Sequence, residues 1–141
     1  MKIMIDNNIF LDVFQNRKPF VEYSSKVLRL VETKQVKGYI TANSITDIYY
    51  VLNRFLKDKK KVYATIEILL QIINIIDVTS KDVRKAFHAD AGDFEDELIT
   101  VCAERAKMDY IVTRNTEDFT SSPVPAVTPD DFLRIFFEQK F

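Results

Sequence analysis

Two stretches of the sequence decide the fold: DFEDEL at residues 93–98 and YIVTRNTEDF at residues 110–119. The first places acidic side chains at the start of a predicted helix, and the second is a short apolar run followed by further acids. The chain opens in the same way, because Asp6 directly follows the apolar run Ile3–Ile5. A carboxylate at the end of a buried strand gains nothing from packing and must be solvated, paired or bound to a metal. Three acidic clusters at three element ends therefore suggest one shared site.

Composition limits the class of protein. With 141 residues and 47% apolar side chains, the chain is expected to form a single domain over residues 1–141. A net charge of -1 provides no overall field for nucleic acid, so contact with a polyanion would depend on a local basic patch. The lone Cys102 excludes an intrachain disulfide and suits a reducing compartment. The most apolar tract, residues 66–78, is interrupted by polar side chains, so we expect a cytoplasmic protein with no membrane span.

Glycine and histidine are scarce in this sequence, and their scarcity excludes several kinds of binding and catalytic site. Only two glycines are present, Gly38 and Gly92, which excludes a dinucleotide fingerprint and a phosphate-cradling loop. The single histidine, His88, excludes a two-histidine ribonuclease mechanism and a multi-histidine zinc site. Catalysis in this chain would therefore depend on carboxylates, hydroxyls and a hard metal ion.

Apolar segments divide the chain into alternating strands and helices. We expect strands at residues 2–6, 39–41, 72–78, 110–113 and 126–127. We expect helices at residues 20–33, 45–56, 62–70 and 94–107, with a short helix after Thr79 and a last helix that begins at Thr128. The short helix is expected to turn Val83, Ala86 and Phe87 inward.

The order of these elements predicts an α/β sandwich with a mainly parallel sheet. Pro123 and Pro125 flank the last apolar pair, so the strand at residues 126–127 is expected at an edge of the sheet.

Open parallel sheets bind ligands outside the carboxyl ends of their strands. Asp6 ends the first strand, Asp47 is expected in the first turn of the helix after the second strand, and Asp96 begins the helix before the fourth. The residues expected to project toward this one edge are Asp6, Asp47, Asp96, Asn115 and Asp118. Carboxylates gathered in this way raise one another's pKa, whereas Mg²⁺ or Mn²⁺ relieves the repulsion.

Each acidic residue also has a simpler interpretation. Asp93, three residues before Asp96, fits a helix cap with a capping-box partner. Asp47 lies off the apolar stripe of its helix, as expected for a residue on the solvent-exposed face. Asp118 could cap a turn together with Thr116. We interpret Asp93 as a cap and Asp96 as a metal ligand. The convergence of the clusters supports the site more than any single residue does.

With these residues in place, the chain resembles the PIN-domain family, whose members are metal-dependent ribonucleases and include toxins of many bacterial toxin–antitoxin pairs. The resemblance rests on IDNNIFLD at residues 5–12, DFED at 93–96, IVTRN at 111–115 with Asp118-Phe119, and the late residues 128–133. It implies a three-layer α/β/α sandwich with five parallel strands, and frequently a homodimer.

The resemblance also assigns roles to residues of the predicted site. It makes Asp6 and Asp96 central metal ligands, directly or through water, and Asp118 an outer acidic member. It makes Thr113 a support through a hydroxyl hydrogen bond, and Asn8 a residue that orients Asp6 or the waters of the metal.

The chain departs from the family pattern at two positions. It has Asp47 where many members carry Glu, and the neutral Asn115 where many carry Asp. We therefore predict one well-held Mg²⁺ or Mn²⁺ and at most a weak second ion.

An acidic site needs basic residues nearby to bind RNA. Arg114, beside the site, is placed to hold a phosphate bidentately, and Arg17 and Lys18 are further candidates for phosphate contact. Tyr50, off the apolar stripe of its helix, is the better candidate for base stacking. The function we expect is a Mg²⁺- or Mn²⁺-dependent endoribonuclease that acts as a toxin neutralised by an antitoxin protein.

Two other functions compete with this hypothesis. Asn115 and the shorter Asp47 could have weakened the site into a PIN-like module that binds RNA or protein without cleavage. A phosphoryl-aspartate protein using Asp6 is disfavoured, because haloacid-dehalogenase-type phosphatases usually carry a second Asp where this chain has Asn8. In a response-regulator receiver, Asp77 would lack its acidic companions.

Overall fold

Strand β1 (Lys2–Ile5) lies at the centre of a five-stranded sheet in the computed structural model, which describes residues 1–139. The strand order is β3-β2-β1-β4-β5, with β2 at Lys37–Thr41, β3 at Asn74–Ile76, β4 at Tyr110–Val112 and β5 at Ala126–Val127. All four pairings between neighbouring strands are parallel. The parallel sheet and the edge position of β5 are therefore confirmed. The last two residues of the predicted domain, 140–141, lie outside the described residues.

The apolar run of β1 is continuous because the strand is covered on both faces. Successive side chains of a strand point to opposite faces. Ile3 and Ile5 accordingly join the larger core, while Met4 joins the smaller core on the other face. A strand buried in this way can place a polar residue only at its end, and Asp6 follows it directly.

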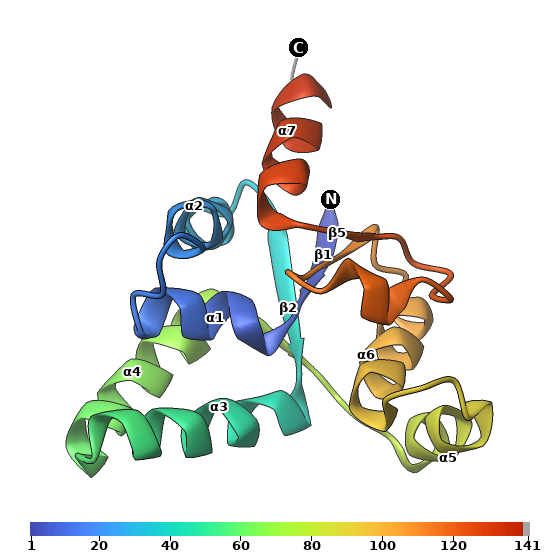
Figure 1. Ribbon diagram of the computed structural model, residues 1–141, viewed down its shortest axis with the longest axis horizontal. Helices are drawn as coiled ribbons and strands as arrows, with labels where there is room; N and C mark the ends of the chain where they lie inside the picture. Colours follow the sequence, from blue (N-terminus) through green and yellow to red (C-terminus); the bar gives the residue numbers. More distant parts are fainter. Residues whose placement is uncertain (140–141) are drawn as a thin grey trace.

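Helices cover both faces of the sheet, which confirms the three-layer α/β/α sandwich (Figure 1). The larger core is formed with α1 (Asn7–Phe14), α2 (Val21–Glu32), α3 (Ala42–Leu56), α4 (Lys59–Ile72) and α7 (Pro129–Gln139). The smaller core is formed with α5 (Ser80–Ala89) and α6 (Phe94–Arg105). Within residues 1–139, no helix combines the length and apolar character needed to cross a membrane.

Four details of the sequence interpretation were wrong or incomplete. Helix α1 was not predicted, and β3 is shorter than residues 72–78 because α4 continues to Ile72. Asp47 lies in the second turn of α3, since that helix begins at Ala42. Val83 and Phe87 are 39% and 67% exposed rather than turned inward, whereas Ala86 is buried as expected.

An ion pair between the buried Asp82 and the partly exposed Arg105 joins the two helices of the smaller layer. Thr79 and Asp82 form a capping box at the start of α5, as expected. The Arg105 guanidinium at the end of α6 donates to both carboxylate oxygens of Asp82, at 3.0 and 2.9 Å, and to the backbone oxygen of Asp77. Burial alone would raise the pKa of Asp82, but the hydrogen bonds from Arg105 and Thr79 lower it below its ordinary value. The pair therefore fixes α6 against α5.

Strand β2 approaches the end of α2 too closely for a side chain at Gly38. A Cβ at this position would lie 2.7 Å from Val31 Cγ2, 2.8 Å from Val31 Cγ1 and 3.0 Å from Ile73 Cδ1. The Val31 and Ile73 side chains are themselves buried, so they have little room to move away.

We predict that Gly38→Ala destabilises the protein by about 1–3 kcal/mol, the usual cost of overpacking a core. The measurement is the urea midpoint of unfolding. Adding Val31→Ala to Gly38→Ala should restore part of the loss, so that the two substitutions are non-additive. An unchanged midpoint for Gly38→Ala would show that β2 and α2 separate easily.

Candidate active site

Asp6 lies at the carboxyl end of the central strand and is only 8% exposed. The Thr113 hydroxyl, just beyond β4, donates a hydrogen bond of 2.8 Å to Asp6 Oδ2. The register that pairs Ile5 with Val112 brings these two residues together. Burial raises the pKa of Asp6 above its ordinary value, although the Thr113 and Asn7 hydrogen bonds and the Arg114 charge oppose that rise. The carboxylate is thus held in place without full compensation of its charge.

Asp96 is the third residue of α6 and is half-buried. Its backbone N–H donates to Asp93 Oδ1 at 3.0 Å, which confirms Asp93 as the cap of the helix. Burial raises the pKa of Asp96 to about 6, and the negative charges of Asp93, Asp6 and Asp118 add to that effect. The structure therefore brings Asp6, Asp96 and Asp118 close enough for their charges to interact.

The segment after β4 forms a short 3₁₀ helix, η1 (Thr116–Phe119), that carries Asp118. Its start is fixed by the Asn115 N–H, which donates to Thr113 Oγ1 at 3.1 Å, and by the Asp118 N–H, which donates to the Asn115 oxygen at 3.0 Å. Phe119 is buried and anchors η1, while Asp118 stays exposed. Thr113 consequently supports both Asp6 and the loop that carries Asn115.

Asp47 is joined to a further acidic residue, Glu95, to which the sequence interpretation assigned no role in the site. A hydrogen bond to Asp47 raises the pKa of Glu95 to about 7, together with partial burial and the charges of Asp47, Asp93 and Asp96. Two carboxyl groups can share a hydrogen bond only when one of them holds a proton. The signal in the sequence was the position of Glu95 directly before Asp96, in the first turn of α6.

Oxygen donors are the ligands that Mg²⁺ and Mn²⁺ prefer, so the chemistry of this cluster fits a hard divalent ion. Over residues 1–139, however, no group of three or more Asp, Glu, His or Cys side chains is arranged as a metal site. The charges of Asp6 and Asp118 contribute to the raised pKa of Asp96, so these carboxyl groups lie near one another even though they do not form such a group. Binding an ion would require side-chain rotation, for which the exposed Asp118 is free.

Arg114 lies beside the acidic cluster and is held by two contacts. Its Nε is 2.9 Å from Asp12 Oδ2, and its guanidinium carbon lies 4.0 Å from the centre of the Phe20 ring. Asp12, in α1, is fully buried; Ser24 Oγ donates to its Oδ2 at 3.0 Å, and Arg17 Nη1 lies 3.9 Å from its Oδ1. Among the described residues, neither Asp12 Oδ1 nor Arg114 Nε has an aligned hydrogen bond. Ion pairing with two arginines therefore compensates the buried Asp12, whose role the sequence interpretation missed.

The remaining predicted residues lie around these groups. Arg17 shares Asp12 with Arg114 and donates from Nε to Gln15 Oε1 at 2.6 Å, whereas Lys18 is exposed between α1 and α2. Asn8 lies in the first turn of α1 and, within residues 1–139, makes no side-chain hydrogen bond to Asp6. Tyr50 is 64% exposed on α3.

Comparison with known proteins places this geometry in a family. The family model of the PIN domain matches residues 2–117. Ribonuclease VapC1 of Aquifex aeolicus (strain VF5) is 29% identical over 136 residues, which cover 93% of this chain and 92% of that protein.

Two solved structures show the same fold at low sequence identity. A DNA-bound VapBC from Salmonella typhimurium superposes with a TM-score of 0.70 at 17% identity, over 92% of this chain and 98% of that chain. A toxin-antitoxin complex from Klebsiella pneumoniae gives a TM-score of 0.65 at 20% identity, over 90% of this chain and 97% of that chain. Because the family model spans most of the sequence and the fold agrees, this chain belongs to the PIN-domain family.

Proposed function

We propose that this protein is a Mg²⁺- or Mn²⁺-dependent endoribonuclease that hydrolyses RNA phosphodiester bonds and acts as the toxin of a toxin–antitoxin pair. The observation that carries the proposal is the convergence of Asp6, Asp96 and Asp118: burial, together with the charges of Asp93, Asp6 and Asp118, raises the pKa of Asp96 to about 6. Structural acids are normally paired or solvated, so an uncompensated cluster is typical of a functional site. The similarity to a protein named as a ribonuclease and to a toxin-antitoxin complex supports the substrate class and an antitoxin partner.

In this proposal Asp6, Asp96 and Asp118 hold the ion. The chemistry that a bound Mg²⁺ or Mn²⁺ supplies is neutralisation of phosphate charge and activation of water. Thr113 keeps Asp6 in one orientation through its hydrogen bond. Asn8, which makes no side-chain hydrogen bond to Asp6 within residues 1–139, is assigned to the waters of the ion.

The other polar residues complete the site around RNA. Arg114 binds a phosphate through the guanidinium N–H groups that Asp12 leaves free, and Arg17 and Lys18 extend the basic surface. Asp47 acts together with Glu95, with which it shares a hydrogen bond, and Asn115 contributes a neutral oxygen. We further propose that the protein works in the cytoplasm, which the single cysteine suits, and that it forms a homodimer, as its family resemblance implies.

A second candidate is a PIN-like module that binds RNA or protein without cleaving it. It is favoured by two observations: the engagement of Asp47 with Glu95, and the lack of a ready ligand set for a metal among residues 1–139. This candidate predicts RNA or antitoxin binding that does not depend on metal and leads to no product.

We predict that Asp6→Asn and Asp96→Asn each lower the rate of RNA cleavage by about 100-fold or more, because each removes a charge that binds the ion. Cleavage of RNA in Mn²⁺ is measured on a denaturing gel, with Asp90→Asn as the control. Asp90 is exposed at the end of α5 in a left-handed conformation that Asn adopts readily. Full cleavage by both variants, or by the parent protein in chelator, would reject the nuclease.

We predict that Mn²⁺ raises the thermal midpoint strongly at a pH above the Asp96 pKa of about 6, and only weakly below it. A carboxyl group with a raised folded-state pKa binds protons more tightly in the folded protein. Without metal, the raised pKa of Asp96 therefore makes the folded protein more stable as the pH falls through about 6, and less stable as the pH rises through that value. Asp96→Asn should remove most of the Mn²⁺ response; an equal response in that variant would place the ion elsewhere.

We predict that Asp12→Asn destabilises the protein by about 1–3 kcal/mol. This loss is smaller than the loss from breaking a fully buried ion pair, because both arginine side chains reach solvent. It should also raise KM for RNA with little change in kcat, because Arg114 loses the ion pair that positions it. Urea unfolding and cleavage kinetics give the two measurements. The double variant Asp12→Asn/Arg114→Gln should lose less stability than the sum of the single losses. Additive losses would mean that the two residues act independently.

A further inference from the structure

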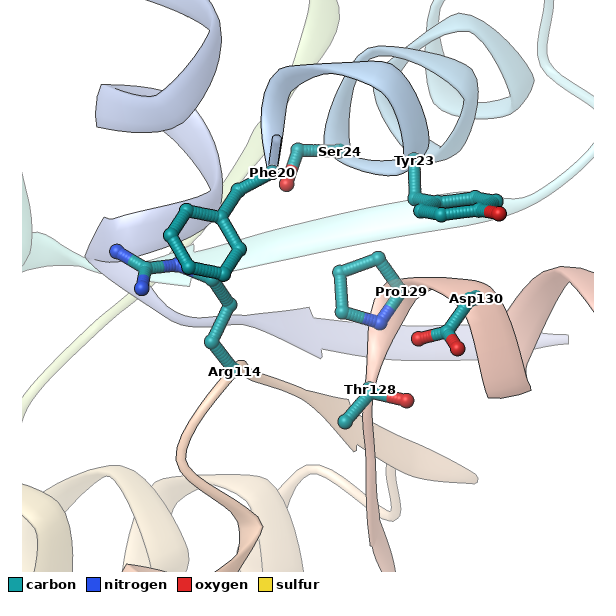
Figure 2. A pocket seen from close by; sticks show the side chains of 7 residues that line it. All are labelled: Phe20, Tyr23, Ser24, Arg114, Thr128, Pro129 and Asp130. Carbon is teal, nitrogen blue, oxygen red and sulfur yellow. The ribbon is translucent and has the colours of Figure 1, made fainter. Parts of the chain in front are cut away.

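A small pocket lies between the start of α2 and the start of α7, outside the acidic cluster (Figure 2). Its volume is about 140 Å³. The side chains that form its walls are Phe20, Tyr23, Ser24, Arg114, Thr128, Pro129 and Asp130. Pockets for drug-sized ligands occupy roughly 300–1,000 Å³, so this one suits a single flat ring system.

Arg114 links the pocket to the candidate active site, because its side chain lines the pocket and its charge acts on Asp6. This residue directly follows Thr113, whose hydroxyl binds Asp6, while its own side chain forms one wall of the pocket. Figure 2 shows the guanidinium beside the Phe20 ring, on the side away from Tyr23 and Asp130. A ligand in the pocket would therefore lie next to a group bound at the acidic cluster.

The walls of the pocket combine exposed aromatic faces with polar groups. Phe20 and Tyr23 are 42% and 43% exposed, although an apolar ring gains from being covered. Arg114 already stacks on one of these rings, an arrangement that binds flat, polarisable bases in RNA-binding proteins.

The polar groups at the mouth distinguish a base from a phosphate. The exposed carboxylate of Asp130 repels an anion but accepts hydrogen bonds from the amino and imino groups of a base. Thr128 adds a hydroxyl that donates or accepts, while Ser24 is already committed to Asp12. A neutral heterocycle with donor groups on its edge therefore matches the lining better than a phosphate does.

We propose that this pocket binds one nucleobase of the RNA substrate, next to the nucleotide whose phosphate lies at the acidic cluster. The base stacks on the Phe20 and Tyr23 rings, and its edge bonds to Asp130 and Thr128. The pocket thereby gives the enzyme a preference for sequence at one position near the cut. This inference rests on the proposed function, because it takes RNA as the substrate.

The test measures RNA binding in an Asp6→Asn background, so that it does not depend on cleavage. Fluorescence anisotropy with labelled single-stranded rA, rC, rG and rU oligonucleotides compares Phe20→Leu with Phe55→Leu. The matched control, Phe55, is an exposed phenylalanine (55%) near the end of α3. Phe20→Leu and Tyr23→Ala should each weaken binding of the preferred oligonucleotide about tenfold or more, whereas Phe55→Leu should not.

Further readouts separate a base pocket from a general loss of structure. Phe20→Leu, Tyr23→Ala and Asp130→Asn should each flatten the preference among the four oligonucleotides. In Tyr23→Ala the salt dependence of binding should stay the same, because Arg114, the residue assigned to phosphate, stacks on Phe20. Thermal midpoints check that the variants fold. Equal affinity of Phe20→Leu and Phe55→Leu, or no RNA binding by the Asp6→Asn parent, would overturn the pocket assignment. Selective loss of binding with no cleavage by the unmodified protein would retain the pocket and reject the nuclease.

Discussion

The negative charge of Asp6, buried at the end of the central strand, is the constraint that the surrounding structure has to meet. The strand cannot cover this carboxylate, so neighbouring elements supply what stabilises it. β4 brings the Thr113 hydroxyl to its Oδ2, and the start of α1 contributes a backbone hydrogen bond from Asn7. These groups orient the carboxylate but leave its pKa raised by burial. A bound cation would neutralise the negative charge that these hydrogen bonds leave uncompensated.

The buried carboxylates of this protein divide into two groups according to their partners. Asp82 has a bidentate arginine, which lowers its pKa despite burial and locks α5 to α6. Asp12 likewise lies between arginines and fixes the side chain of one of them. Asp6 and the half-buried Asp96 instead lie near other acids, and burial together with those charges raises their pKa values. Acids with basic partners therefore maintain the fold, and acids without them mark the candidate site.

Much of the fold could be predicted from the sequence, because short apolar runs alternating with amphipathic helices are a local signal. Helix α1 was missed since it has only eight residues, too few for a helical period of apolar residues to be recognised. The strand β3 was made too long because one apolar run, residues 72–76, spans the end of α4 and the strand. The pairing of Asp12 with Arg114 could not be predicted, because the two residues lie in distant segments and no regular spacing in the sequence relates them. Likewise, only the packed helices show that Glu95 reaches Asp47.

The lengths of the two outer strands have a consequence for how this protein meets other molecules. β3 has three residues and β5 only two, with prolines close before the latter. An outer strand of this length exposes too few free backbone groups to template another strand. The sheet is thus protected from edge-to-edge aggregation, a hazard for a chain with such apolar strands. Recognition of a protein partner would accordingly use helical surfaces, where side chains rather than backbone groups determine which partner fits.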